Sequence, residues 1–207
     1  MKVILLNGSP NANGCTFTGL SIIQEQLEKN GVETELFQVG NKPIIGCTAC
    51  GTCYKPDNAR KCVHDDMVNT VADALKKADG LIVGSAVHYA GATGAITSFL
   101  DRLFFSTAPE VKRLKFGAAI VSCRRGGNSS TFDQLNKYFT ISQMPVVSSC
   151  YWNGIHGNTP EEVYADEEGV RIMRTLADNM AYLIKCKYGS NVELPEPQPF
   201  VMTNFIR

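Results

Sequence analysis

The sequence predicts an α/β protein built on a doubly wound sheet of parallel strands. Five apolar, strand-like runs alternate with segments whose apolar residues recur at helical spacing, which is the pattern of βαβ units. The length of 207 residues suits one domain with a single core, and we assign that domain to residues 1–187. The final segment, 188–207, is rich in proline and is predicted to be an extended arm.

The individual elements follow from the apolar pattern. The first strand, 2–6, is continuously apolar, and the helix predicted over 16–29 places Leu20, Ile23 and Leu27 on one face. The other strands are predicted at 32–39, 80–87, 116–123 and 145–150, and the other helices at 67–77, 95–105, 131–139 and 160–185. Thr159 followed by a proline favours the start of the last helix, in which we expect a break near residues 168 and 169.

Composition and charge argue against several classes of protein. Lys plus Arg and Asp plus Glu both number 20, so the basic excess that is typical of nucleic-acid binders is absent. No apolar run is long enough to cross a bilayer. The apolar start of the chain ends at Gly8-Ser9-Pro10, too early for a signal peptide. We therefore expect a cytoplasmic protein that binds neither nucleic acid nor a membrane.

The loop after the first strand, from Asn7 to Thr16, is suited to an anion. Its glycines and small polar residues let the backbone approach a ligand closely, and the following helix offers free N–H groups at a positive dipole end. The loop has neither a P-loop motif nor G-x-G-x-x-G. Because it contains no Lys or Arg, it suits one terminal phosphate better than a triphosphate with its metal ion. An ordinary strand-to-helix turn is the alternative.

Two further loops are expected at the same edge, since ligands of such sheets lie beyond the carboxyl ends of the strands. The third strand is followed by G-S-A-V-H-Y-A-G-A-T-G from Gly84 and then by F-L-D-R from Phe99, and the fourth by C-R-R-G-G-N from Cys123. In order and spacing, these motifs resemble the flavodoxin-like NAD(P)H-dependent FMN reductases. The resemblance is strongest to the branch that includes the iron–sulfur flavoproteins.

This resemblance implies a flavodoxin-like sheet with strand order 2-1-3-4-5 and FMN as cofactor. It places the FMN phosphate against Ser9, Asn11, Cys15 and Thr16. It places the isoalloxazine ring against Ala86, Val87, His88 and Tyr89 on one side and against Cys123, Arg124, Arg125, Gly126 and Gly127 on the other. Asn11, Cys15 and His88 depart from the family pattern, with the loss of a cation and an amide donor at the phosphate.

The implied reaction takes hydride from NADH or NADPH and reduces a small acceptor, such as a quinone or free flavin. Backbone N–H groups of the third-strand loop, with Arg124 or Arg125, would stabilise the developing negative charge. We assign no catalytic residue, and we interpret His88 as a hydrogen-bonding residue at the rim rather than as a proton donor. The alternative function is an electron carrier of the iron–sulfur flavoprotein type. The neutral chain favours the enzyme, because carriers that dock electrostatically tend to be acidic.

Cysteines at positions 47, 50, 53 and 62 form a second candidate site. Thiolates at every third residue can surround one soft metal centre, and four thiolates also suit zinc. The resemblance implies a [4Fe-4S] cluster held by Cys47, Cys50, Cys53 and Cys62, although the gap before Cys62 is longer than that branch usually has. Cluster, zinc and reduced cysteines without metal all stay open, and the last is the interpretation we favour. The cysteines at 123, 150 and 186 are expected in the core.

The C-terminal third predicts contacts between subunits. The apolar side chains of the arm cannot be buried by the arm alone, and the family resemblance implies a homodimer or homotetramer. Trp152, the one tryptophan of the chain, is either an interface anchor or a cap over the core. We expect both the arm and the Trp152 loop in a subunit interface.

Overall fold

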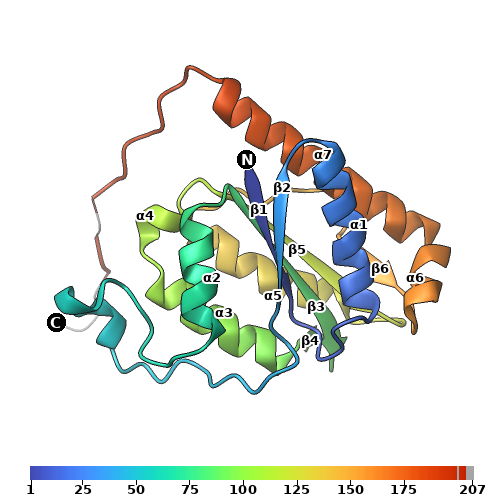
Figure 1. Cartoon of the computed structure of the whole chain (residues 1–207), viewed down its shortest axis with the longest axis horizontal. Coiled ribbons are helices and arrows are strands. Elements are labelled where there is room, and N and C mark those ends of the chain that lie inside the picture. Colours follow the sequence, from blue (N-terminus) through green and yellow to red (C-terminus); the bar gives the residue numbers. More distant parts are fainter. Residues whose placement is uncertain (200, 204–207) are drawn as a thin grey trace.

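A sheet of parallel strands runs through the middle of the molecule, with helices on both faces (Figure 1). The computed structural model describes residues 1–199 and 201–203. The parallel strands are β1 (Lys2–Asn7), β2 (Glu33–Gln38), β3 (Gly80–His88), β5 (Phe116–Cys123) and β6 (Gly154–His156). They lie in the order β2-β1-β3-β5-β6, and the short β4 (Gly91–Ala92) pairs antiparallel with the end of β3. The predicted flavodoxin-like order of five parallel strands is therefore confirmed.

The two faces of the sheet are covered by different helices. One face carries α1 (Cys15–Lys29), α6 (Pro160–Ala165) and α7 (Glu167–Gly189), and the other carries α2 (Met67–Lys76), α3 (Gly94–Ser106) and α5 (Asn128–Ile141). In β1, Val3 and Leu5 point to the first face, whereas Ile4 and Leu6 point to the second. Because both faces are buried, the strand is continuously apolar rather than alternating.

Shorter elements complete the chain. The 3₁₀ turns η1 (Thr52–Tyr54) and η2 (Pro56–Asn58) lie in the cysteine-rich segment between β2 and α2, and α4 (Pro109–Lys112) follows α3. Neither β4 nor α4 was predicted, because two and four residues are too short for a periodic signal. Within the described residues, none of the helices has the length and hydropathy that a bilayer crossing needs.

The prediction of a fifth strand at 145–150 is wrong. That segment makes one isolated bridge, between Gly117 and Val146, and the strand forms instead at Gly154–His156. The side chain of Asn153 explains the shift, since its Nδ2 donates to the carbonyl of Ala119 at 3.0 Å and takes a place on the edge of β5 that a strand residue would occupy. The chain loops outward before it pairs again.

Two smaller predictions also need correction. The last helix breaks at Asp166 rather than at 168 and 169, because the Asp166 carboxylate accepts from the N–H of Gly169 at 2.9 Å and so caps α7.

Cys123 is buried as expected, but Cys150 and Cys186 are exposed. Cys150 lies where the predicted strand does not form, and Cys186 lies on the outer side of α7.

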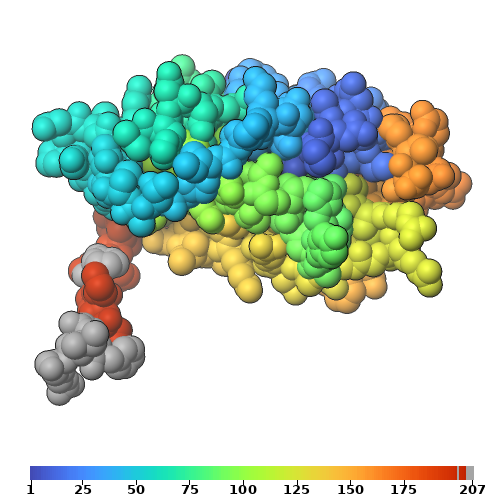
Figure 2. All heavy atoms as spheres, turned by 90° about the horizontal axis from the view of Figure 1, so that it is seen from below, coloured from blue at the N-terminus to red at the C-terminus, as the bar shows by residue number. Residues whose placement is uncertain are grey.

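Beyond α7 the described residues form neither helix nor strand, and Figure 2 shows this arm standing away from the body. Val192, Leu194, Val201 and Met202 are exposed on it. Arg113 donates a hydrogen bond to the carbonyl of Pro195 near its base. The end of the predicted arm, 204–207, lies outside the described residues. The division of the chain into a domain, 1–187, and an arm stays a prediction.

The packing of α5 on the sheet gives a first test. The Phe139 side chain is fully buried, and a Cβ added at Gly117 of β5 would lie 2.5 Å from its ring. We expect Phe139→Ala to lower the free energy of unfolding by about 3–5 kcal/mol, because the cavity cannot collapse fully. On the same helix, Ile141 is 86% exposed, and Ile141→Ala should change it by less than about 0.5 kcal/mol. Urea denaturation that gives equal losses would contradict this packing.

Candidate functional site

A cleft of about 250 Å³ lies beyond the carboxyl ends of the strands. In the order β2-β1-β3 the chain changes direction at β1 and β3, which is where such sheets bind ligands. Of the predicted FMN residues, those that line the cleft are Ser9, Asn11, Cys15, Thr16, Ala86, Val87, His88, Cys123 and Arg124. The sequence motifs of three separate loops are thus brought together around one space.

Other predicted residues lie outside this lining. They are Tyr89, Arg125, Gly126 and Gly127. Tyr89 is fully exposed at the tip of the β3–β4 hairpin. Sequence reasoning in turn missed Ser122, Gly157, Asn158 and Pro160, which also line the cleft. Gly157 and Asn158 belong to the loop after β6, and Pro160 begins α6. Placing the fifth strand at 145–150 hid the fact that this loop reaches the same edge.

The start of α1 has the form of an anion site. Helices α2, α3, α6 and α7 each begin with a side chain that accepts a hydrogen bond from the first turn. The N-cap of α1, Gly14, offers none, as is also true of α4 and α5. The first-turn N–H groups of a helix have no partners within the helix. At α1 they lie beside the cleft, where they fit the oxygens of a phosphate group.

The side chain of Asn7 fixes the loop that precedes α1. It is fully buried at the end of β1, and its Oδ1 accepts from the N–H of Ser9 at 3.1 Å. Its Nδ2 donates to Oε1 of Gln38 at 2.5 Å, and the Gln38 amide donates in turn to the carbonyl of Ser9 at 2.8 Å. Asn7 at the end of β1 and Gln38 at the end of β2 therefore fix the loop through hydrogen bonds to the backbone of Ser9.

Two buried hydroxyl groups are available to an anion in the cleft. Ser9 Oγ accepts from the N–H of Asn11 at 3.1 Å, which leaves its own hydrogen free to donate. Thr16 Oγ1 and Ser122 Oγ lie 2.7 Å apart. One of this pair donates to the other, so one hydroxyl hydrogen of the pair is left for a ligand. The Thr16–Ser122 bond also ties the first loop to β5.

The thiol of Cys15 has a different partner from the one we expected. Its Sγ donates to the carbonyl of Gly157 at 3.4 Å, and burial raises the pKa of the thiol above its usual value. The side chain is thus a neutral link between α1 and the loop after β6. Its backbone N–H still belongs to the uncapped first turn.

The other wall of the cleft is built from the β3–β4 hairpin. Tyr89 and Ala90 form its two-residue turn with φ values of 49° and 59°, a left-handed conformation that costs energy for residues other than glycine. Ser130 Oγ of α5 donates to the carbonyl of Ala90 at 2.7 Å. A Cβ added at Gly127 would lie 2.8 Å from Cα of Ala90. The start of α5 therefore holds the hairpin in this strained form beside the cleft.

The cleft has hydrogen-bond donors suited to a phosphate group at one end and the β3–β4 hairpin at the other. It lies where the strand order of the sheet reverses. These features define a flavodoxin-like, flavin-binding protein. The sequence profile of the NADPH-dependent FMN reductases matches residues 1–159. The chain therefore belongs to the NADPH-dependent FMN reductase family, and it is an FMN-dependent oxidoreductase.

Curated relatives come from the branch that the sequence resembles. Two proteins of Methanocaldococcus jannaschii, each named an iron–sulfur flavoprotein, are similar to this chain. One is 30% identical over 91% of this chain and all of its own length, and the other is 29% identical over 89% of this chain and 98% of its own. The predicted family and branch are therefore confirmed.

Solved structures share the fold at low identity. A flavodoxin from the domain Archaea is 20% identical with a TM-score of 0.58, and the alignment covers 89% of this chain and 99% of that one. The apo form of an NADH:FMN oxidoreductase is 16% identical with a TM-score of 0.63, over 88% and 89% of the two chains. These likenesses agree with the flavodoxin-like order of the strands.

The four predicted metal-binding cysteines meet at a second place, beside the carboxyl-terminal half of α3. Cys47, Cys50, Cys53 and Cys62 line one small cavity together with His64 and Arg102. Burial raises the pKa of the Cys53 thiol, and the nearby sulfurs of the other three cysteines raise it further. Arg102 lies eight residues beyond Gly94, where α3 begins, so this cavity lies about 12 Å along the helix from its start.

The cysteine cavity has the donor set of a metal site without a formed ligand arrangement. Among residues 1–199 and 201–203, no group of three or more Cys, His, Asp or Glu side chains is arranged to hold a metal ion. Four thiolates are the ligands of tetrahedral zinc. Four thiols spread around one cavity fit the donor set of an iron–sulfur cluster, whose irons each take one thiolate.

The phosphate site can be tested through its two hydroxyls. We expect the double substitution Ser9→Ala, Thr16→Ala to raise the Kd for FMN by at least about 100-fold, since two hydrogen bonds to a charged group are lost and each contributes about 1.5–3 kcal/mol. Fluorescence titration of the apoprotein with FMN measures this. The matched control, Thr140→Ala with Ser142→Ala, removes two hydroxyls at the far end of α5 and should leave the Kd unchanged. Equal Kd values for both double variants would place the phosphate elsewhere.

Proposed function

We propose that the protein takes hydride from NADH or NADPH in the flavin cleft and reduces a small acceptor, such as a quinone or free flavin. The observation that carries this proposal is the convergence of the uncapped start of α1 and the β3–β4 hairpin on one open cleft. When bound there, FMN supplies the hydride chemistry. The nicotinamide donor agrees with the description of the family.

The residues of the cleft have separate tasks in this proposal. Ser9, Thr16 and the first-turn N–H groups of α1 bind the phosphate and fix the position of the ring. Ala86 and Val87 are half-buried and present backbone and small apolar side chains to one side of the ring. Arg124 lines the cleft and is exposed, so its guanidinium can approach oxygen atoms on which negative charge develops. His88 lies at the rim of the cleft, and hydride transfer from the nicotinamide to the flavin needs no proton from it.

The second candidate function is an electron carrier of the iron–sulfur flavoprotein type. The cavity lined by four cysteines supports it, as do the names of the relatives. Cys47, Cys50, Cys53 and Cys62 would hold a [4Fe-4S] cluster, which would supply single-electron transfer. The net charge of zero supports the reductase over a carrier that finds its partners by charge.

We also propose a homodimer or homotetramer. The exposed apolar residues of the arm support this, together with Trp152, which is 57% exposed and lies against Tyr151 with ring centroids 5.0 Å apart. Trp152 thus does not cap the core of its own chain. Exposed apolar clusters of this kind are typical of surfaces that a partner covers.

The reductase is tested by mixing FMN-loaded protein with each nicotinamide in the absence of oxygen. We expect NADH or NADPH to bleach the flavin absorbance in a single-turnover experiment, and admission of a quinone to restore it with one quinone consumed per flavin. If neither nicotinamide bleaches the flavin, while dithionite does, the chain is a flavoprotein but not a nicotinamide-dependent reductase.

Adjacent arginines provide a matched pair of variants. Arg124 lines the cleft, whereas Arg125 is exposed and does not. We expect Arg124→Gln to slow flavin bleaching about tenfold, less than the full loss of a buried donor because the side chain is exposed. Arg125→Gln should leave the rate as in the parent protein. Stopped-flow traces that give the same rate for both variants would remove Arg124 from the proposed charge stabilisation.

A further inference from the structure

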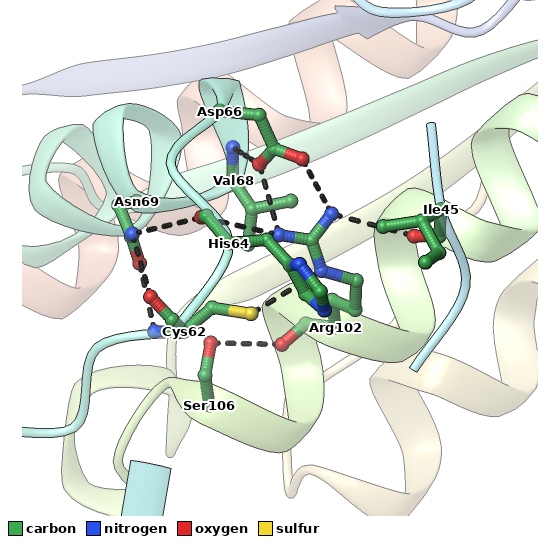
Figure 3. Close-up of polar contacts among 8 residues, drawn as sticks. All are labelled: Ile45, Cys62, His64, Asp66, Val68, Asn69, Arg102 and Ser106. Atoms are coloured by element: carbon green, nitrogen blue, oxygen red, sulfur yellow. Dashed lines mark hydrogen bonds and ion pairs between the residues drawn. The ribbon is translucent and has the colours of Figure 1, made fainter. Parts of the chain in front are cut away.

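Arg102 of α3 has the largest side chain that is fully buried in the described part of the chain, with 1% of its surface exposed. Figure 3 shows its guanidinium at the centre of a polar network between α3 and the cysteine-rich segment. Nη1 and Nη2 donate to the two carboxylate oxygens of Asp66 at 2.5 and 3.0 Å. They also donate to the backbone carbonyls of Ile45 and His64 at 3.3 and 3.4 Å.

The remaining donor of this arginine is directed at a cysteine. Nε donates to Sγ of Cys62 at 3.2 Å, so all five N–H groups of the guanidinium have acceptors. A neutral thiol is a weak acceptor, whereas a thiolate or a metal-bound thiolate is a strong one. A buried cation with this contact is therefore better matched to an anionic sulfur than to a thiol.

A second observation points to an occupant of the same cavity. Nε2 of His64 is buried and has no hydrogen-bond partner among the described atoms. His64 lines the cavity together with Arg102 and the four cysteines. A buried polar atom without a partner costs about 1–3 kcal/mol, so its position on this wall indicates a group that accepts or donates a hydrogen bond there.

The charge of Arg102 is only partly compensated. Burial opposes the cation, but the hydrogen bonds that Arg102 donates to Asp66 and Cys62 raise the pKa of Arg102, and an arginine stays protonated in proteins. Among the residues that the structure describes, Asp66 is the one carboxylate to which it donates. Its positive charge therefore acts on Cys62 across 3.2 Å, at a position largely screened from water.

We propose that Arg102 positions Cys62 as the fourth ligand of the cysteine cavity and that its charge raises the reduction potential of an iron–sulfur cluster held there. The inference rests on the second candidate function. One-electron reduction adds negative charge to the thiolate-bound group, so a buried cation beside one ligand favours the reduced state. Hydrogen bonds to ligand sulfurs and local charge are known determinants of such potentials.

A purely structural role for Arg102 makes a different prediction. The contacts with Asp66 and the two carbonyls hold the cysteine segment against α3, and breaking them from either side would loosen it in the same way. An electrostatic role requires opposite effects. Removing the arginine takes away positive charge, whereas removing the Asp66 carboxylate leaves that charge uncompensated.

The test is a potentiometric titration of full-length protein, prepared without oxygen and supplied with iron and sulfide. At a fixed potential, we expect Arg102→Gln to lower the ratio of reduced to oxidised cluster at least tenfold, which is about 59 mV for one electron. Asp66→Asn should raise the ratio, and Asn can still cap α2 at this position. Arg171→Gln is the control, because Arg171 is exposed on α7.

The outcomes separate the inference from the function on which it rests. Suppose that both variants keep their iron. If the reduction potential is then unchanged, or shifts in the same direction in both variants, the proposed role of Arg102 is overturned, and the second candidate function is not. If Arg102→Gln retains no iron, the direction of the shift in Asp66→Asn decides. Parent protein without iron and acid-labile sulfide would overturn both the inference and the second candidate function, and FMN binding would be unaffected.

Discussion

The shape of the loop at the proposed flavin site depends on one buried amide, the side chain of Asn7. This side chain is fully buried and bonds to Ser9 and to Gln38, and an unpaired buried amide costs about 1–3 kcal/mol. The neighbouring backbone is equally constrained. Thr93 Oγ1 donates to the carbonyl of Gly8 at 2.6 Å, and a Cβ at Gly8 would lie 2.6 Å from Ile96. The loop consequently has one shape, and that shape opens the start of α1 to the cleft.

A fixed loop compensates for the missing cation. In the proposed site the phosphate would have no Lys or Arg in its loop, so attraction over a distance would contribute little, and the donors must already be in place when the ligand arrives. Donors that do not reorganise bind a charged group more strongly than mobile ones. The strained hairpin at Tyr89 and Ala90, held by α5, follows the same principle at the other end of the cleft.

Sequence reasoning succeeded where a pattern is local. The apolar run of β1 and the periodicity of α1 predicted the parallel sheet, and the motifs of three loops predicted most of the cleft, because parallel strands bring their carboxyl ends to one edge. The strand order was implied by the family resemblance of those motifs. Sequence reasoning failed where one side chain redirects the backbone. Asn153 displaces the fifth strand and Asp166 breaks the last helix. The Thr16–Ser122 pair and the Arg102–Cys62 contact join residues 106 and 40 positions apart, and no periodicity reports such contacts.

The central claim is that neutral donors at the start of α1 bind the phosphate of FMN. Comparing FMN with riboflavin, which lacks the phosphate, tests it most directly. Calorimetric titration of the apoprotein should give a Kd for FMN at least about 100-fold below that for riboflavin, since two or more charge-assisted hydrogen bonds are lost without the phosphate. Equal Kd values for the two compounds would contradict the claim.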